Sequence, residues 1–284
     1  MNRFDRLIRR IVPSTVVLSR NPLIQFLGWA NDLWLRLLYP EMRALPPNHL
    51  RMRVGVGNRI FFNQILCLRS GYNFWLFAFA KGFCRLDSSI VEIGCGYGRK
   101  PEHLKNFRMG GERFTGRYVG VDIDPDLLGF ARNHFPPDQF QFLQTTQGST
   151  TYASNGARLP GSEFRFPLPD ASQDFVFSTS LFTHLLEAEL ANYVRESLRI
   201  LKPGGTMLMN YFCYDHLSSL QQLRGRWTFH HQVGQARVES LESPEAAVAY
   251  GRSFMEDLCR TLGFSEATTL LDHQMMQSQV LCRK

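Results

Sequence analysis

Cysteines are few and scattered, which argues against a metal centre or a redox pair. The chain of 284 residues has six of them, namely Cys67, Cys84, Cys95, Cys213, Cys259 and Cys282. No two stand at the short spacing that zinc sites and thioredoxin-like motifs require. Free thiols in a reducing compartment are the simpler interpretation, so we expect a cytoplasmic protein without a metal site.

Long apolar runs are also absent. The N-terminus is rich in arginine, but no uninterrupted apolar run with a small-residue cleavage site follows, and we predict no secretory signal. Residues 23–38 are rich in leucine and tryptophan, yet they include Gln25, Asn31, Asp32 and Arg36. These polar groups are too many for a membrane span, so the stretch predicts an amphipathic helix.

Acidic residues are scarce only near the N-terminus. Residues 1–70 contain eleven arginines and three acids, a balance of +8, whereas the rest of the chain has 21 Lys and Arg against 22 Asp and Glu. The basic excess belongs to a helical extension, which we place at residues 1–84, ahead of a nearly neutral domain at residues 85–284. A neutral domain argues against a nucleic-acid partner, because such enzymes neutralise phosphates with Lys and Arg.

A first basic helix is predicted at residues 2–12, where apolar side chains recur at helical spacing opposite four arginines. One hypothesis is that residues 1–12 make peripheral contact with an anionic membrane. The other, which we favour, is that this helix and residues 23–38 cap the following domain, since most amphipathic helices bury their apolar face on their own protein.

A glycine-rich turn lies between a predicted strand, Ile90–Ile93, and a predicted helix at residues 100–107. The turn reads Gly94-Cys95-Gly96-Tyr97-Gly98, and glycine lets the backbone turn sharply and approach a ligand. A dinucleotide site would need a third glycine where Arg99 stands. Glu92 would repel a pyrophosphate but suits the ammonium and sulfonium of S-adenosylmethionine.

A second predicted strand, Arg117–Val121, ends on Asp122, and Pro125 begins the next helix. A carboxylate at this place can accept hydrogen bonds from both ribose hydroxyls of a nucleotide. It could instead cap the helix, a task that Asp124 could do equally well. We assign Asp122 to the ribose.

These segments resemble the motifs of class I S-adenosylmethionine-dependent methyltransferases. Four segments in the right order carry the resemblance, which covers about residues 85–284: Val91–Gly98, Val119–Pro125, Phe166–Asp170 with Phe175–Ser178, and Leu201–Gly205, which resembles the turn before the fifth strand. The resemblance implies a Rossmann-like, doubly wound α/β fold with a seven-stranded sheet. Its C-terminal antiparallel hairpin would come from residues 268–271 and 278–281, after a helix at Glu245–Leu262 that Gly263 stops.

The resemblance also implies a cofactor site for S-adenosyl-L-methionine. The methionine part would be held by Glu92 and the turn, with the expected contacts at Gly94, Cys95, Gly96 and Gly98. Asp122 would hold the ribose, Ile123 would pack on the adenine, and Ser178 completes the set. The third strand departs from the family because it ends in Thr145, Thr146 and Gln147 instead of an acid, which weakens the expected bond to the adenine amino group.

The acceptor should lie beyond the fourth and fifth strands, at residues 178–184 and 212–216. His184 is a candidate base, although it could equally fix a loop by hydrogen bonding. Asp215 and His216 form a second candidate pair. The aromatic stretch at residues 227–231 could form a lid or an ordinary surface loop.

The acceptor class follows from motifs that are absent. Amino-methylating nucleic-acid enzymes carry Asn/Asp-Pro-Pro-Tyr/Phe after the fourth strand, where this chain has Ser178-Thr179-Ser180-Leu181, and no Pro-Cys pair is present. We therefore favour a small-molecule, sugar or lipid acceptor methylated at oxygen or nitrogen. The alternatives are an RNA or protein methyltransferase that docks through the basic extension, and a nucleotide-binding protein that has lost catalysis.

Residues 45–55 lead from the extension toward the domain. Arg51 and Arg53 could reach an acidic acceptor. The alternative is a linker stiffened by Pro46 and Pro47, with its arginines in solvent.

Overall fold

A computed structural model describes residues 15–54, 65–145, 163–216, 227–270 and 277–284. The helix predicted at residues 2–12 lies outside the described residues, as do Thr146 and Gln147.

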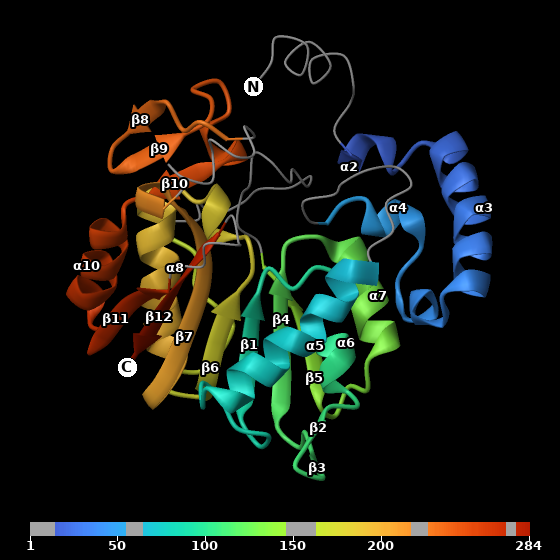
Figure 1. The fold of residues 1–284 in the computed structure, drawn as a ribbon, viewed down its shortest axis with the longest axis horizontal. Helices are drawn as coiled ribbons and strands as arrows, with labels where there is room; N and C mark the ends of the chain where they lie inside the picture. Colours follow the sequence, from blue (N-terminus) through green and yellow to red (C-terminus); the bar gives the residue numbers. More distant parts are fainter. Residues whose placement is uncertain (1–14, 55–64, 146–162, 217–226, 271–276) are drawn as a thin grey trace.

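A twisted sheet forms the centre of the molecule (Figure 1). Its strands lie in the order β5-β4-β1-β6-β7, followed by β12 and β11. Their bounds are β1 Ser89–Ile93, β4 Arg117–Asp122, β5 Phe140–Gln144, β6 Gln173–Ser178, β7 Leu201–Cys213, β11 Glu266–Leu270 and β12 Ser278–Arg283. The first five are parallel, whereas β12 runs antiparallel to both β7 and β11. These seven strands confirm the predicted sheet and its C-terminal hairpin.

Three short strands extend this sheet past the end of β7. They are β8 His231–Val233, β9 Ala236–Val238 and β10 Val248–Tyr250, and β10 pairs with the last two residues of β7. The prediction of a helix from Glu245 is therefore wrong at its start, because residues 248–250 are fully buried in a strand. The helix itself, α10, spans Arg252–Leu262 and ends at Gly263 with a φ of +117°, as predicted.

Helices cover both faces of the sheet. One face carries α5 Ile65–Ala80, α6 Pro101–Leu104 and α7 Pro125–His134, and the other carries α8 Glu187–Ile200 and α10. Side chains alternate along each strand, so that Ile90 packs in the core beneath α5, α6 and α7, and Val91 packs in the core beneath α8 and α10. Helix α6 is a single turn, shorter than the predicted helix at residues 100–107. The expected turn at residues 201–205 lies within β7, whose register with β6 shifts there.

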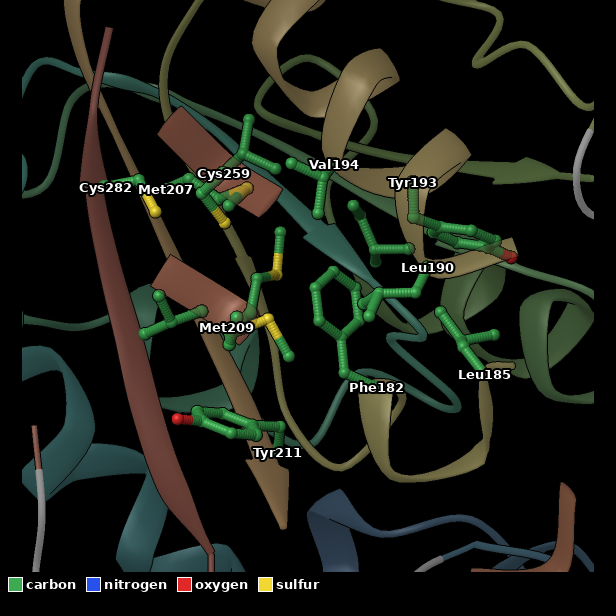
Figure 2. Packing of buried hydrophobic residues seen from close by; sticks show 14 of the residues in the cluster. Phe182, Leu185, Leu190, Tyr193, Val194, Met207, Met209, Tyr211, Cys259 and Cys282 are labelled. Carbon is green, nitrogen blue, oxygen red and sulfur yellow. The ribbon is translucent and has the colours of Figure 1, made fainter. Parts of the chain in front are cut away.

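The core between the sheet and α8 is made mainly of aliphatic and sulfur-containing side chains. Figure 2 shows Phe182 beside Met209 of β7, and Met207 of the same strand close to Cys259 of α10 and Cys282 of β12. Five cysteines are buried free thiols: Cys84, Cys95, Cys213, Cys259 and Cys282.

The core on the other face includes residues that precede residue 85. Trp75 of α5 is fully buried, its ring lies 5.4 Å from that of Phe177 in β6, and its indole Nε1 donates to the Lys100 carbonyl at 2.8 Å. Phe79 and Phe83 join the same cluster. Helix α5 is thus packed as part of the sheet's own core, and the division at residues 84 and 85 stays a prediction.

The first part of the extension forms a separate layer beside α7. It consists of α2 Thr15–Leu18, α3 Pro22–Leu38, the 3-10 turn η1 Pro40–Ala44 and α4 Asn48–Arg51. The helix predicted at residues 23–38 is thereby confirmed. Met42, Leu45 and Leu50 pack on Tyr97 of the glycine turn and on Leu127 of α7. None of the described helices combines the length and apolarity that a membrane span needs.

Both interpretations of the arginines in residues 45–55 are wrong. Arg51 is fully buried, forms an ion pair with Asp32 at 2.5 Å and donates to the Pro46 carbonyl. Arg53 is also buried and bonds to Ser19 and to two acids of α7 and its cap. The arginines are therefore neither solvated nor free for an acidic acceptor, because tertiary contacts engage them within the protein.

Candidate functional site

The glycine turn joins the carboxyl ends of β1 and β4. The backbone N–H groups of Gly94 and Cys95 donate to the Val121 carbonyl at 2.8 and 3.2 Å. Gly94, Gly96 and Gly98 have φ values of +78°, +56° and +87°, which L side chains rarely adopt. At Gly98 a Cβ would also lie 2.6 Å from the ring of Phe135. The turn therefore requires glycine, as the sequence predicts.

Asp122 holds the turn against the end of β4. One carboxylate oxygen accepts from Gly96 N at 2.7 Å and the other from Asp124 N at 3.0 Å. Burial raises the pKa of Asp122, while these hydrogen bonds oppose the rise. Each oxygen can accept a further hydrogen bond, so the predicted contact with ribose hydroxyls remains open to this side chain.

Asp124 performs the second task that we considered for Asp122. Its side chain accepts from Asp126 N and Leu127 N at 2.9 and 3.3 Å and so caps α7. The cap therefore belongs to Asp124.

Glu92 lies beneath the turn in the interior of the protein. Its side chain accepts a short hydrogen bond from the Tyr118 hydroxyl, and only 3% of the residue is exposed. Burial raises the pKa of Glu92 to about 7, against the effects of this hydrogen bond and of the charges on Lys100 and Arg99. A cationic ligand nearby would favour the charged carboxylate.

The end of β5 departs from the family pattern, as the sequence indicates. Thr145 is buried, and its backbone N–H donates to the Asp122 carbonyl at 3.0 Å. Its hydroxyl is 3.5 Å from the same carbonyl. Ile123, the residue predicted to pack on the adenine, is half-buried and directly follows β4.

Ser178 ends β6 directly beside the turn. It is in register with Ile93 of β1, and Leu181 lies 3.7 Å from the position of a Cβ on Gly94. The Ser178 residue is 1% exposed, and its hydroxyl has no hydrogen-bond partner among the described residues. A buried hydroxyl without a partner is costly, so this group is suited to a ligand that brings a polar atom to the strand end.

The candidate acceptor residues lie at the ends of β6 and β7. His184 Nδ1 is 2.8 Å from the Glu245 carbonyl, which can only accept, so Nδ1 carries the proton and Nε2 is the basic nitrogen. Burial lowers the pKa of His184. Asp215 accepts from Arg252 N at 2.6 Å at the start of α10, and His216 is buried. The stretch at residues 227–231 leads into β8, and Trp227 and Phe229 pack on Phe212 of β7.

Two features of the site were not predicted. Tyr118 could have been found, because alternation puts it on the same face of the sheet as Glu92 of the neighbouring strand. Arg53 and Val54 of the extension could not. Arg53 Nη1 pairs with Asp126 at 2.7 Å, and a Cβ on Gly96 would meet Val54 at 3.4 Å. The extension therefore lies against the glycine turn.

An open cavity of about 620 Å³ also lies between the extension and α7. Arg20, His49 and Asp126 are among its lining residues. None of the residues predicted to bind the cofactor lines it.

The sheet order, the glycine turn and the acid at the end of β4 together define a Rossmann-like domain of the class I methyltransferase type. Comparison with known proteins leads to the same class: residues 91–209 match the family model described as the methyltransferase domain. Residues 91–209 are thus similar to a methyltransferase domain, a class that uses S-adenosylmethionine as its cofactor.

Individual relatives are distant. A probable S-adenosylmethionine-dependent methyltransferase of Mycolicibacterium smegmatis is 26% identical over 121 residues, which are 43% of this chain and 37% of that protein. The chain thus matches little more than a third of the length of this curated relative. A solved protein of Pyrococcus horikoshii has a TM-score of 0.51 and 17% identity, over 78% of this chain and 92% of that one. A methyltransferase of Methanosarcina mazei has a TM-score of 0.47 and 16% identity, over 72% of this chain and 96% of that one. The first of these structures supports the fold.

Proposed function

We propose that this chain transfers a methyl group from S-adenosylmethionine to oxygen or nitrogen of a small-molecule, sugar or lipid acceptor. The observation that carries the proposal is the position of Asp122, which accepts a hydrogen bond from Gly96 of the turn and stands at the carboxyl end of β4. Ligands of open α/β sheets bind at this edge.

The residues around the turn fit this cofactor. Asp122 would accept from the ribose, the backbone of residues 94–98 would face the methionine part, and Ser178 would gain a partner for its buried hydroxyl. Glu92 supplies a carboxylate whose charged form a cation favours. When bound, the cofactor supplies an electrophilic methyl group on a sulfonium.

On the acceptor side, the contribution of the chain is to orient the acceptor and, where the acceptor must lose a proton, to accept it. His184 is suited to this task because its lowered pKa keeps it neutral at pH 7, with Nε2 as the basic position. Asp215 and His216 remain the second candidate pair.

The acceptor class rests on charge. The part of the chain after residue 70 is close to neutral, and two arginines of the extension, Arg51 and Arg53, are engaged in ion pairs. They are therefore poor candidates for contacts with phosphates, which weakens the alternative of an RNA substrate.

Calorimetry with S-adenosylmethionine tests the proposal, with NADH as the control ligand. Gly96→Asp should abolish binding, because a carboxylate would stand in the turn beside Asp122. Gly110→Asp is the matched control: Gly110 has a φ of +62°, similar to that of Gly96, but nothing lies within 4 Å of its Cβ position. Binding of NADH without binding of S-adenosylmethionine would overturn the proposal.

Once an acceptor is found, His184→Gln separates the two roles of this side chain. If His184 is the base, the variant should lose about 100-fold or more in kcat while its affinity for the cofactor stays unchanged. Unchanged kcat with reduced thermal stability would leave His184 the role of fixing the Glu245 loop.

A further inference from the structure

Helix α3 turns its apolar side away from the rest of the protein, whereas a helix that only caps its own protein would bury that side. The residues it buries are Gly28 and Asp32. Its outer side carries large apolar side chains that are between 40% and 73% exposed: Leu23, Phe26, Leu27, Trp29, Leu33, Trp34, Leu37 and Leu38. We refer to these eight side chains as the outer face of α3. Figure 1 shows the helix at the edge of the molecule, with α4 on its inner side.

Tertiary contacts hold this orientation. Asp32 accepts from Asn48 N at 2.7 Å and from Arg51 Nη2, so its carboxylate is bound to α4. Gly28 lies close to Asn48, where a Cβ would be 2.8 Å from the amide oxygen. Turning the apolar side inward would break a buried ion pair and would bring a larger side chain against Asn48, where Gly28 now lies. The outer face therefore remains exposed as long as α3 and α4 stay together.

An apolar surface of this extent on a folded protein marks an interaction site. The outer face carries two tryptophans, and Tyr39 follows the helix at 40% exposure. Such rings favour the boundary between water and lipid. Within α3 the charged side chains are Asp32 and Arg36, and neither belongs to the exposed residues of the helix.

The charge that precedes α3 in the sequence indicates the kind of partner. Residues 1–20 hold five arginines and one acid, and Arg20, directly ahead of α3, is exposed. Basic side chains flanking an apolar helical face with tryptophan are typical of helices that lie in the plane of an anionic membrane surface. A protein interface has a rim of mixed polar residues, whereas Gln25 is the polar side chain exposed on α3.

We propose that the outer face of α3 docks on a lipid bilayer that carries anionic headgroups. The helix would lie in the membrane plane, with Phe26 and Trp34 in the apolar layer and Arg20 near the headgroups. This places the docking surface on α3, beyond residues 1–12.

Vesicle flotation of the full chain tests the proposal with phosphatidylcholine vesicles that contain or lack about a third of phosphatidylglycerol. The wild type should float with the anionic vesicles, and added salt should weaken binding. Phe26→Gln combined with Trp34→Gln should weaken partitioning about tenfold or more, because each aromatic side chain contributes a substantial share of the buried apolar area.

The matched control replaces two exposed apolar side chains elsewhere, Met109→Gln with Leu241→Gln, and should bind like the wild type. Circular dichroism and thermal unfolding establish that each variant is folded. Three results would overturn the proposal: a wild type that remains soluble with anionic vesicles, a double variant of α3 that floats equally well, or a wild-type dimer in sedimentation equilibrium that the α3 variant dissociates. The last outcome would assign the outer face to a second copy of the chain.

Discussion

Arg53 Nη1 lies 3.2 Å from a carboxylate oxygen of Asp124. Asp124 caps α7, and it follows Asp122 by two residues. The same guanidinium contacts Asp126 at 2.7 Å, and its Nε donates to the Ser19 hydroxyl. This side chain ties the N-terminal extension to the region where the ribose of a nucleotide would bind.

Arg53→Gln should destabilise the protein by roughly 1–3 kcal/mol, since a buried cation paired with two acids is lost but Asp126 is half-exposed and stays solvated. Affinity for S-adenosylmethionine should fall as well, because the cap of α7 loosens. Urea unfolding and calorimetry measure the two effects. The control is Arg85→Gln, which removes an exposed pair with Asp87 and should cost under about 1 kcal/mol. Equal effects of the two substitutions would contradict the link.

Glu92→Gln should change how stability depends on pH. The folded protein holds the Glu92 proton up to a pKa of about 7, whereas the unfolded chain releases it near 4.5. The folded state therefore binds more protons between these values, and wild-type stability falls as pH rises through this window, by on the order of 3 kcal/mol. The variant lacks this fall, so the difference in free energy of unfolding should shift in its favour from pH 5 to pH 8. Glu112→Gln, at an exposed position, is the control; parallel curves for Glu92→Gln and wild type would refute the prediction.

Trp75→Ala should lower the free energy of unfolding by about 3–5 kcal/mol, because removal of the fully buried indole leaves a cavity and the Lys100 carbonyl loses its donor. Leu76→Ala, one residue further along α5 and 43% exposed, should cost under about 1 kcal/mol. Chemical denaturation measures both. A chain that begins at residue 85 should accordingly fail to fold, and a stable 85–284 fragment would restore the domain boundary predicted from charge.

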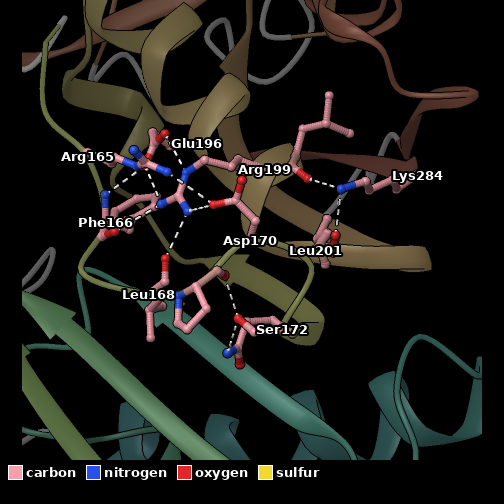
Figure 3. A network of polar contacts seen from close by, with 12 residues as sticks. Arg165, Phe166, Leu168, Asp170, Ser172, Glu196, Arg199, Leu201 and Lys284 are labelled. Atoms are coloured by element: carbon pink, nitrogen blue, oxygen red, sulfur yellow. Dashed lines mark hydrogen bonds and ion pairs between the residues drawn. The ribbon is translucent and has the colours of Figure 1, made fainter.

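Arg199→Lys should loosen the segment that leads into β6. Arg199 donates to the carbonyls of Phe166 and Leu168 and pairs with Glu196 and Asp170 (Figure 3). A lysine cannot reproduce the forked hydrogen bonds of the guanidinium. We expect the free energy of unfolding to fall by roughly 1–3 kcal/mol through the lost contacts with the carbonyls. Asp170→Asn is the comparison, because Asp170 is exposed and solvent can replace its contact. Thermal unfolding of both variants tests this prediction. Equal shifts in their unfolding temperatures would contradict the assignment of the effect to the carbonyl contacts.

The strand–turn–strand unit at residues 89–122 could be predicted because its determinants are local. Gly94, Gly96 and Gly98 adopt positive φ values, which their missing Cβ permits, and Asp122 is the last residue of its strand. The start of α10 could not be predicted in this way. Residues 248–250 form a short apolar segment, and only pairing with β7 and β9 made them a strand.

Arg51 and Arg53 mark the limit of the sequence most clearly. A local pattern of arginines beside prolines is compatible with solvent, with an acidic ligand or with internal ion pairs, and their partners Asp32 and Asp124 lie 19 and 71 residues away. The orientation of α3 has the same origin. Periodicity indicates an amphipathic helix but leaves open which face turns inward, and here the buried carboxylate of Asp32 decided it.

The sequence by itself determined the first strand, the glycine turn and the acid at the end of the next strand. Backbone sterics and short-range hydrogen bonding determine these features, and both act within a few residues. Only the tertiary structure decided that Glu92 is buried against Tyr118, that the extension covers the turn through Arg53 and Val54, and that α3 faces outward. These depend on burial and on charges brought together from distant parts of the chain, whose free energies no local window contains.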